Sequence, residues 1–223
     1  MKNINEEYSL LSTKAYEEIK RSIVEEELKG GERLTESKLS DLLGVSRTPI
    51  REALRRLNFE GYISMTPNYG FAINELTEDD MREILEVRRA LEGEAARMAA
   101  QRITGQQKES LTRNFQRIRS LNDVGEDKET HVQRFMTLDV EFHHEILSIA
   151  GNSRFISMEE SLQDRLYRLR FACLSVDESI RECTEQHERI LNAILDGNAE
   201  AADFYSREHL IRIQNLSNRL FHK

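Results

Sequence analysis

Four side chains with metal-binding chemistry occur in the second half of the sequence. Asp139 and His143 stand four residues apart in a segment with helical patterning, so their side chains share one helix face. His187 and His209 each lie in a later helical segment, shortly before an apolar residue. One carboxylate and three imidazoles suit a divalent ion such as zinc, nickel, manganese or iron, with positions left for water or a ligand oxygen.

A structural explanation of these histidines stays open beside the metal site. Buried polar side chains are usually satisfied by hydrogen bonds, so a histidine on an apolar helix face is often a core residue and not a ligand. His144, the neighbour of His143, should point to another side of its helix. The residue types and spacing alone therefore support two hypotheses, a metal site and a set of hydrogen-bonded core histidines.

Arginines form the second group of candidate functional residues. Arg47, Arg51 and Arg55 recur every four residues, which places them along one face of a helix. Ser46 and Thr48 stand at the start of that helix, where hydroxyls and free backbone N–H groups suit phosphate oxygens. Arginine can also bond to guanine through two hydrogen bonds in the major groove. The pattern indicates a DNA-recognition helix, and a solvated basic face on a small helical bundle is the alternative.

The elements around the arginines predict a helix-turn-helix with a wing. A short helix is expected after Thr35, with Gly44 as its stop, and the arginine helix follows. The other face of the arginine helix carries apolar side chains for burial, namely Ile50, Ala53, Leu54 and Leu57. An amphipathic helix is expected over residues 10–29, and two β-prone runs around the turn at residues 67–70 predict a hairpin. That hairpin would serve as the wing, with its tip on DNA.

Long amphipathic helices follow from Thr77 to residue 223. Thr77 precedes acidic residues that suit the first turn of a helix, and six or seven helices are expected after it. The fold class is therefore mainly α. We expect an N-terminal winged helix-turn-helix domain of three helices and a β-hairpin over residues 1–75, then an all-helical bundle domain over residues 76–223.

Composition limits the class of protein further. The 223 residues carry 40 acidic and 32 basic side chains, and the net charge of −8 argues against a protein that coats nucleic acid nonspecifically. No run approaches the roughly 20 apolar residues of a membrane-spanning helix, and the N-terminus lacks the apolar run of a signal peptide. Cys173 and Cys183 form no CxxC motif and no disulfide framework. We expect a cytoplasmic protein without a membrane partner.

The first third of the chain resembles a known DNA-binding domain. GVSRTPIREALRRLNFEGYI followed by TPNYGFAI is similar to the winged helix-turn-helix of GntR-type bacterial transcription regulators. The resemblance implies that Arg47 and Arg51 contact operator DNA, with Ser46 and Thr48 in support. It also implies that Gly70 lies at the wing tip.

Residues 77–220 resemble the all-helical FCD effector domain of the FadR branch of that family. The matching segments are EVRRALEGEAARMAA, LDVEFHHEILSIAGN, and EQHERILNAILDGNAEAA followed by SREHL. The resemblance implies a divalent metal beneath an effector pocket, held by Asp139, His143, His187 and His209.

Two further residues are candidate effector contacts. Arg88 matches an arginine that often faces the effector pocket of such domains, where it can pair with an effector carboxylate. A salt bridge to Glu92, one helical turn on, is the alternative for this arginine. Asn152 is the second candidate, with helix capping as its alternative.

The function that these features predict is transcription regulation in response to a ligand. The protein would bind double-stranded operator DNA as a homodimer, since one recognition helix reads only a few base pairs. A small carboxylate or sugar acid would be sensed at a zinc, nickel or manganese site, and would release DNA or, less often, tighten its binding. Two alternatives remain: a constitutive DNA-binding regulator with a structural metal, and a helical metal-dependent hydrolase, for which the sequence has no HExxH or His-Asp motif.

Overall fold

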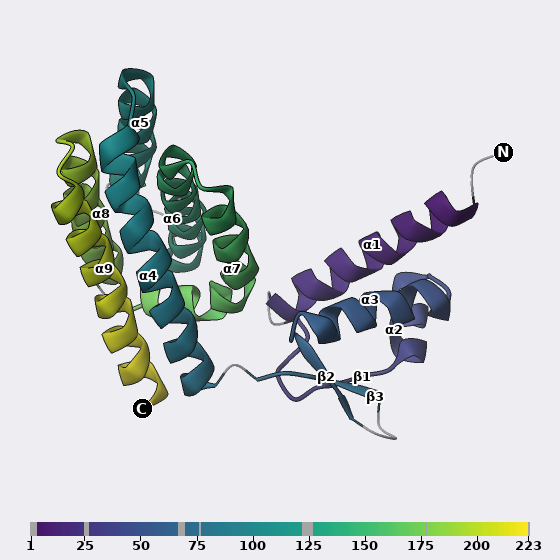
Figure 1. Cartoon of the computed structure of the whole chain (residues 1–223). Helices are drawn as coiled ribbons and strands as arrows, with labels where there is room; N and C mark the ends of the chain where they lie inside the picture. Colours follow the sequence, from purple (N-terminus) through teal and green to yellow (C-terminus); the bar gives the residue numbers. More distant parts are fainter. Residues whose placement is uncertain are drawn as a thin grey trace. The chain divides into compact units, whose positions relative to one another are not determined.

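Two compact units make up the chain, Met1–Thr77 and Glu78–Lys223. The computed structural model (Figure 1) describes residues 4–24, 27–66, 70–75, 77–121, 127–176 and 178–222. Within these residues the chain forms nine helices and three short strands. The expected fold class, mainly α with a small winged N-terminal part, is confirmed.

The first unit contains three helices and one three-stranded sheet. Its elements are α1 (Ile4–Val24), β1 (Arg33–Leu34), α2 (Glu36–Leu43), α3 (Arg47–Phe59), β2 (Ile63–Thr66) and β3 (Gly70–Ile73). The strands are antiparallel in the order β1-β3-β2. The sequence analysis predicted the hairpin of β2 and β3. It missed β1, because a strand of two residues has no recognisable alternation.

Short-range signals define the two helices of the helix-turn-helix. The Thr35 side chain accepts a hydrogen bond from the backbone N–H of Lys38 and so caps the start of α2. Gly44 ends α2 with a φ of 65°, the left-handed conformation that glycine adopts without strain. Ser46 stands at the N-cap of α3 and makes no capping hydrogen bond through its side chain within the described part of the chain. Its hydroxyl is therefore not committed to the helix.

Gly70 is required by the geometry of the sheet. It pairs with Thr66 at the end of the hairpin and has a φ of 84°. A Cβ at this position would lie 3.0 Å from the carbonyl oxygen of Leu34 on the neighbouring strand. Any other residue would therefore be both strained and crowded. The hairpin tip at residues 67–69 lies outside the described residues.

One face of α3 packs into the hydrophobic core of the first unit. Ile50, Leu54 and Leu57 of α3 are fully buried, together with Leu34 of β1 and Ile19 of α1. The apolar face that the sequence predicted for this helix is therefore the buried one. Its arginine face is left exposed.

The second unit is a bundle of six helices within the described residues. They are α4 (Glu78–Arg102), α5 (Gly105–Ser120), α6 (Lys128–Ala150), α7 (Ser153–Leu174), α8 (Ser179–Leu195) and α9 (Ala199–Phe221). α4 packs along α9 and against α6, and α8 packs against α9 and α5. Figure 1 shows α4 and α9 side by side. Within the described residues, none of the helices combines the length and the apolar character of a membrane span.

The interior of this bundle combines apolar side chains with a cluster of ionisable ones, and Phe142 packs directly against His143 and His187. Phe135, Phe142, Leu111 and Ile194 are among its fully buried residues. Several ionisable side chains are equally buried, and they come from α4, α6, α7, α8 and α9: Arg88, Glu92, Asp139, His143, Glu159, Arg170, His187 and His209. Burying such groups is costly unless they are paired or bind an ion. These side chains contact one another across the helix interfaces, and their cluster marks the candidate site.

Candidate functional site

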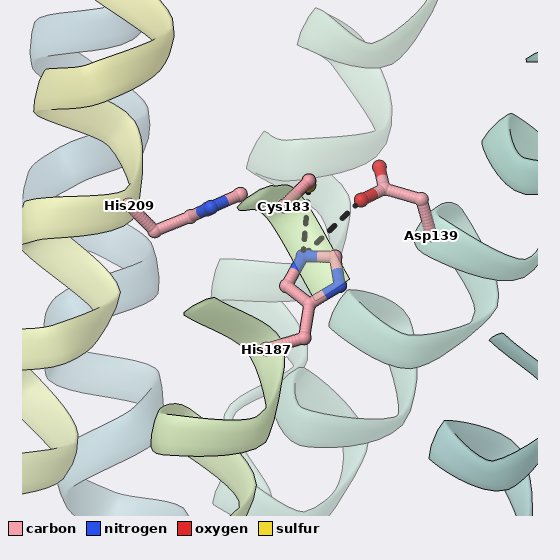
Figure 2. A group of neighbouring side chains, drawn as sticks. All are labelled: Asp139, Cys183, His187 and His209. Atoms are coloured by element: carbon pink, nitrogen blue, oxygen red, sulfur yellow. Dashed lines mark hydrogen bonds and ion pairs between the residues drawn. The ribbon is translucent and has the colours of Figure 1, made fainter. Parts of the chain in front are cut away.

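The bundle brings the four predicted metal ligands together. Asp139 and His143 come from α6, His187 from α8 and His209 from α9, and all four are buried. Asp139 Oδ1 lies 3.3 Å from His187 Nε2 and 3.8 Å from His143 Nε2. The Nε2 atoms of His143 and His187 are 3.2 Å apart. Figure 2 shows His187 between Asp139 and His209.

These separations fit a divalent metal ion. Ligand atoms about 2.0–2.1 Å from a tetrahedral zinc ion lie about 3.3 Å from one another. His187 Nε2 has neighbours at 3.2 Å and 3.3 Å, in His143 and Asp139 respectively. Two imidazole nitrogens that face each other with lone pairs repel, and a cation between them removes that repulsion. The donor set therefore has the chemistry and the spacing of a metal site.

Neighbouring polar side chains orient two of the three imidazoles. His143 Nδ1 lies 2.9 Å from Glu92 Oε2, and His209 Nδ1 lies 2.8 Å from Gln186 Oε1. A partner at Nδ1 leaves Nε2 to bind a metal, which is the usual arrangement around metal-bound histidines. Nδ1 of His187 has no hydrogen-bond partner among the described residues. Sequence reasoning did not identify Glu92 or Gln186 in this role.

The electrostatics keep most of these groups in their metal-binding forms. Burial lowers the pKa of His187 to about 4 and that of His209 well below its ordinary value, so both imidazoles are neutral near pH 7. Burial opposes ionisation of Asp139, yet His143 and Arg170 beside it hold the pKa of this carboxyl below its ordinary value. Burial likewise opposes protonation of His143, and Glu92 outweighs it and raises the pKa of that imidazole.

Cys183 lies in the same cluster, which sequence analysis did not predict. Its Sγ is 3.7 Å from His187 Nε2. Ligand atoms of Asp139, Cys183, His187 and His209 all lie within 4.8 Å of one another. Figure 2 shows these four side chains facing one another. Cys183 precedes His187 by four residues, so the two share a face of α8. That spacing was the sequence signal that could have identified it.

A cavity of about 280 Å³ adjoins the cluster. Asp139, Cys183 and His209 form part of its wall. Four arginines also line it, from α4, α7 and α9: Arg88, Arg170, Arg212 and Arg219. Guanidinium groups bind carboxylates and phosphates through strong charge-assisted hydrogen bonds. The cavity therefore suits a small anion.

Arg88 lines this cavity and also takes part in buried ion pairs. Its Nη2 lies 2.5 Å from Glu92 Oε1, and its Nε donates a hydrogen bond of 2.9 Å to Glu159 Oε1. Arg88 is 2% exposed. The salt bridge that was the alternative for this arginine is therefore present, in a side chain that still borders the cavity.

Asn152 is placed at the start of a helix. Its side chain accepts a hydrogen bond of 3.1 Å from the backbone N–H of Arg154, which caps α7. It is not among the residues that line the cavity. Its contacts are those of the helix cap, the alternative role for this residue.

The predicted DNA-binding residues lie on the exposed side of α3. Ser46, Arg47, Thr48, Arg51 and Arg55 are all exposed, as is Gly70 on β3. Arg51 donates two hydrogen bonds of 2.8 Å to the Glu36 carboxylate on α2. Arg55 pairs with Glu52 at 2.9 Å, and Arg47 donates to the Ser37 hydroxyl at 3.4 Å. The face carries three exposed arginines at helical spacing, and the partners named here are side chains on α2 and α3.

Both units match known protein families. Residues 11–73 match the model described as bacterial regulatory proteins, gntR family, and residues 83–212 match the FCD domain model. The chain is 33% identical over 180 residues to the Nta operon transcriptional regulator of Aminobacter aminovorans, with 81% of each protein covered.

Other relatives with lower sequence identity are also named transcription regulators. The HTH-type transcriptional repressor RspR of Escherichia coli K12 is 27% identical over 198 residues, which cover 89% of this chain and 85% of that protein. The Glc operon transcriptional activator of the same organism is 27% identical over 214 residues, with 87% and 84% covered. The solved structure of E. coli McbR/YncC has the same fold, with a TM-score of 0.74 at 22% identity, and covers 95% of this chain and 98% of that one.

Proposed function

Since the chain belongs to the GntR family of bacterial transcription regulators and carries an FCD domain, we propose that it is a ligand-responsive regulator that binds operator DNA as a homodimer. In this proposal residues 1–75 bind DNA and residues 76–223 sense a small organic acid and dimerise. The family and the named relatives are transcription regulators and not enzymes, so the hydrolase alternative is set aside.

The DNA-binding surface is the exposed face of α3 with its neighbouring hairpin. Arg47, Arg51 and Arg55 present guanidinium groups along this face, and Ser46 and Thr48 stand at the helix start. Arginine can read guanine edges in the major groove, and hydroxyls with free N–H groups at a helix start suit phosphates. Gly70 lets the hairpin turn beside β1 and so positions the wing.

Dimerisation follows from the size of a DNA-binding site. One recognition helix contacts only a few base pairs, and two copies related by a two-fold axis read two half-sites about one helical turn apart. The operator should therefore contain an inverted repeat. The FCD bundle is the part of the chain that we assign to pairing the two copies.

The metal site of the sensing domain consists of Asp139, His143, His187 and His209. A divalent ion held there, such as zinc, nickel or manganese, would supply positive charge and a coordination position for an oxygen ligand. Arg88 and Arg170 would bind the carboxylate of the effector through charge-assisted hydrogen bonds. The buried walls around them would exclude water and so strengthen those contacts.

One observation supports this assignment above the others. The cluster of donor atoms and the arginine-lined cavity share a wall, because Asp139 and His209 belong to both. An anion in the cavity would therefore lie beside the metal site and against arginines from three different helices. A ligand that bridges several helices can change their relative positions, which is what a sensor requires.

The first experiment is a set of melting-temperature measurements on the full-length protein. Samples stripped with a chelator and samples reloaded with Zn²⁺, Ni²⁺ or Mn²⁺ would be heated with and without a library of small carboxylic and sugar acids. A ligand that binds only the folded state raises the melting temperature by mass action. We expect one chemical class of acid to raise it, and only in the metal-loaded protein.

DNA binding is tested on the same samples. Duplexes selected from a random library on the immobilised protein should converge on an inverted repeat. We expect the active acid to weaken binding to the selected duplex; stronger binding would show that the ligand favours the DNA-bound form instead. If no acid shifts the melting temperature while chelation alone lowers it, the protein is instead a constitutive DNA binder with a structural metal.

A further inference from the structure

Cys183 has an unusual position for a buried cysteine. It lies on α8, one turn before His187, and its Sγ is 3.7 Å from the Nε2 atom of that histidine. The same Nε2 atom is the one that faces Asp139 Oδ1 at 3.3 Å. In Figure 2 the dashed lines from His187 run to both Cys183 and Asp139. A sulfur, a nitrogen and an oxygen donor, from Cys183, His187 and Asp139, therefore lie close together.

The separations match those of a metal with a sulfur ligand. With bonds of about 2.3 Å to sulfur and 2.0–2.1 Å to nitrogen, a tetrahedral zinc ion keeps these two atoms about 3.6 Å apart. The observed distance from Cys183 Sγ to His187 Nε2 is 3.7 Å. The ligand atoms of Cys183, Asp139, His187 and His209 also lie within 4.8 Å of one another.

A second observation concerns the two ring nitrogens of His187. His187 is fully buried, and its Nδ1 has no hydrogen-bond partner among the described residues. Within the described part of the chain its close polar contacts are made through Nε2, on the side where the other donors lie. A cation bound at Nε2 would compensate for the burial of this imidazole.

We propose that Cys183 supplies a thiolate ligand to the metal centre, which thereby gains a mixed nitrogen, oxygen and sulfur donor set and selects Zn²⁺ over Mn²⁺. The proposal rests on the metal site of the proposed function and adds a fifth donor to it. Zinc accepts five ligands as well as four, and soft thiolates favour zinc whereas carboxylate oxygens suit manganese. As the sulfur–metal bond forms, the S–H bond breaks and its proton leaves to solvent, with no change of oxidation state.

Cys173 provides a matched control for Cys183. Both cysteines are buried and both line the same cavity. Cys173 comes from α7 and does not belong to the group of clustered donors. A serine at either position removes one buried sulfur beside the cavity, but only the change at Cys183 removes a proposed ligand.

The test uses Co²⁺ as a spectroscopic probe in the full-length protein after removal of other metals by a chelator. Thiolate bound to Co²⁺ produces a charge-transfer band in the near ultraviolet. We expect this band in the wild type and in Cys173→Ser, and its loss in Cys183→Ser with cobalt still bound, as measured by elemental analysis. Bound cobalt without the band in the wild type, or an unchanged band in Cys183→Ser, would overturn the proposal and leave the metal site intact.

Failure of the metal site itself has a different signature. If the wild type binds no cobalt and no zinc, both the metal site and the thiolate ligand are refuted. Circular dichroism checks that each variant is folded, and Cys183→Ala serves if the serine variant is not. The cobalt spectrum of the wild-type protein does not depend on any variant. Absence of the thiolate band there would refute the proposal even if the substituted proteins do not fold.

Metal selectivity gives an independent readout. Competition against a chelator with a known affinity measures Zn²⁺ and Mn²⁺ binding in the same proteins. Loss of the thiolate should weaken Zn²⁺ binding on the order of 10-fold or more and weaken Mn²⁺ binding less. Equal losses for the two ions in Cys183→Ser would contradict selection by sulfur.

Discussion

Glu92 and His143 are in direct contact across the α4–α6 interface, with Glu92 Oε2 2.9 Å from His143 Nδ1. The other carboxylate oxygen of Glu92 lies 2.5 Å from Arg88 Nη2. One carboxylate therefore joins a cavity-lining arginine to an imidazole of the proposed metal site. Burial disfavours its ionisation, but Arg88 and His143 lower the pKa of Glu92 to about 2, so it is charged at neutral pH. A ligand that displaces Arg88 would change the environment of His143 through this carboxylate.

Replacement of Glu92 should weaken the metal site. In Glu92→Gln the charge beside His143 Nδ1 is lost, and with it the preference for an imidazole whose Nε2 is free to bind metal. We expect metal affinity to fall about 10- to 100-fold, the usual effect of losing such an orienting group, as measured by competition with a chelator. Glu94→Gln is the control: Glu94 is on the same helix and pairs with Arg97 at the surface. A similar loss in both variants would show that the effect is general destabilisation of α4.

Removal of two ligands should empty the site. The double variant His187→Ala, His209→Ala lacks two of the clustered donors and should contain far less metal than the wild type by elemental analysis. His144→Ala is the matched control, because His144 lies next to His143 but is exposed on the other side of α6. Equal metal content in the double variant and the wild type would rule out the site.

Stability of the metal-free protein should fall in mild acid. Burial holds the pKa of His187 at about 4 in the folded state, below its ordinary value of 6.5, and shifts His209 in the same direction. Below about pH 6.5 the unfolded chain therefore binds protons that the folded state excludes. The stabilisation is complete above that pH and is lost as the pH falls toward 4. Between pH 7.5 and 5, His187 alone should cost ~2 kcal/mol in the free energy of unfolding.

His143 has the opposite effect on the free energy of unfolding, because its raised pKa stabilises the folded state at low pH. His187 and His209 both act against this contribution, and we expect a net loss of stability. Urea unfolding in the presence of a chelator at the two pH values measures it. His187→Gln should show a smaller pH dependence than the wild type, and His144→Gln should match the wild type. A wild-type unfolding free energy that stays constant over this range would contradict the assignment.

Arg51 should contribute to the affinity for DNA, whereas Arg56 on the same helix should not. Arg51→Ala should weaken binding to the selected operator duplex by ~1–3 kcal/mol if the side chain makes a bidentate contact with a base. Arg56→Ala is the control on the same helix: Arg56 lies over the Tyr16 ring of α1 and pairs with Glu60. Fluorescence anisotropy titrations compare the two. Equal losses would show that only overall charge matters.

DNA binding should also depend steeply on salt. Contacts to phosphates release condensed counterions, so the logarithm of the affinity falls linearly with the logarithm of the salt concentration. Loss of a phosphate contact should lower that slope by about 1, as we expect for Arg47→Ala or Arg55→Ala. The same titrations at several salt concentrations measure it. An unchanged slope in a variant would exclude a phosphate contact by that arginine.

Features that depend on neighbours along the chain could be predicted from the sequence. The spacing of Asp139 and His143 by four residues places them on one helix face, and the same spacing aligns Arg47 with Arg51. Thr35 and Gly44 delimit α2 through local backbone chemistry. These features need no knowledge of the rest of the fold, because a helix imposes its periodicity on whatever sequence forms it.

Contacts between side chains that are distant in the sequence depend on how the helices pack. His187 and His209 reach Asp139 because α8 and α9 pack against each other and around the same interior level. Glu92 and Gln186 gained their roles as partners of imidazoles in the same way, through contacts across helix interfaces. Cys183 became a candidate ligand for the same reason, although its spacing from His187 was visible in the sequence. Helix packing depends on the complementarity of whole surfaces, so local residue patterns do not reveal it.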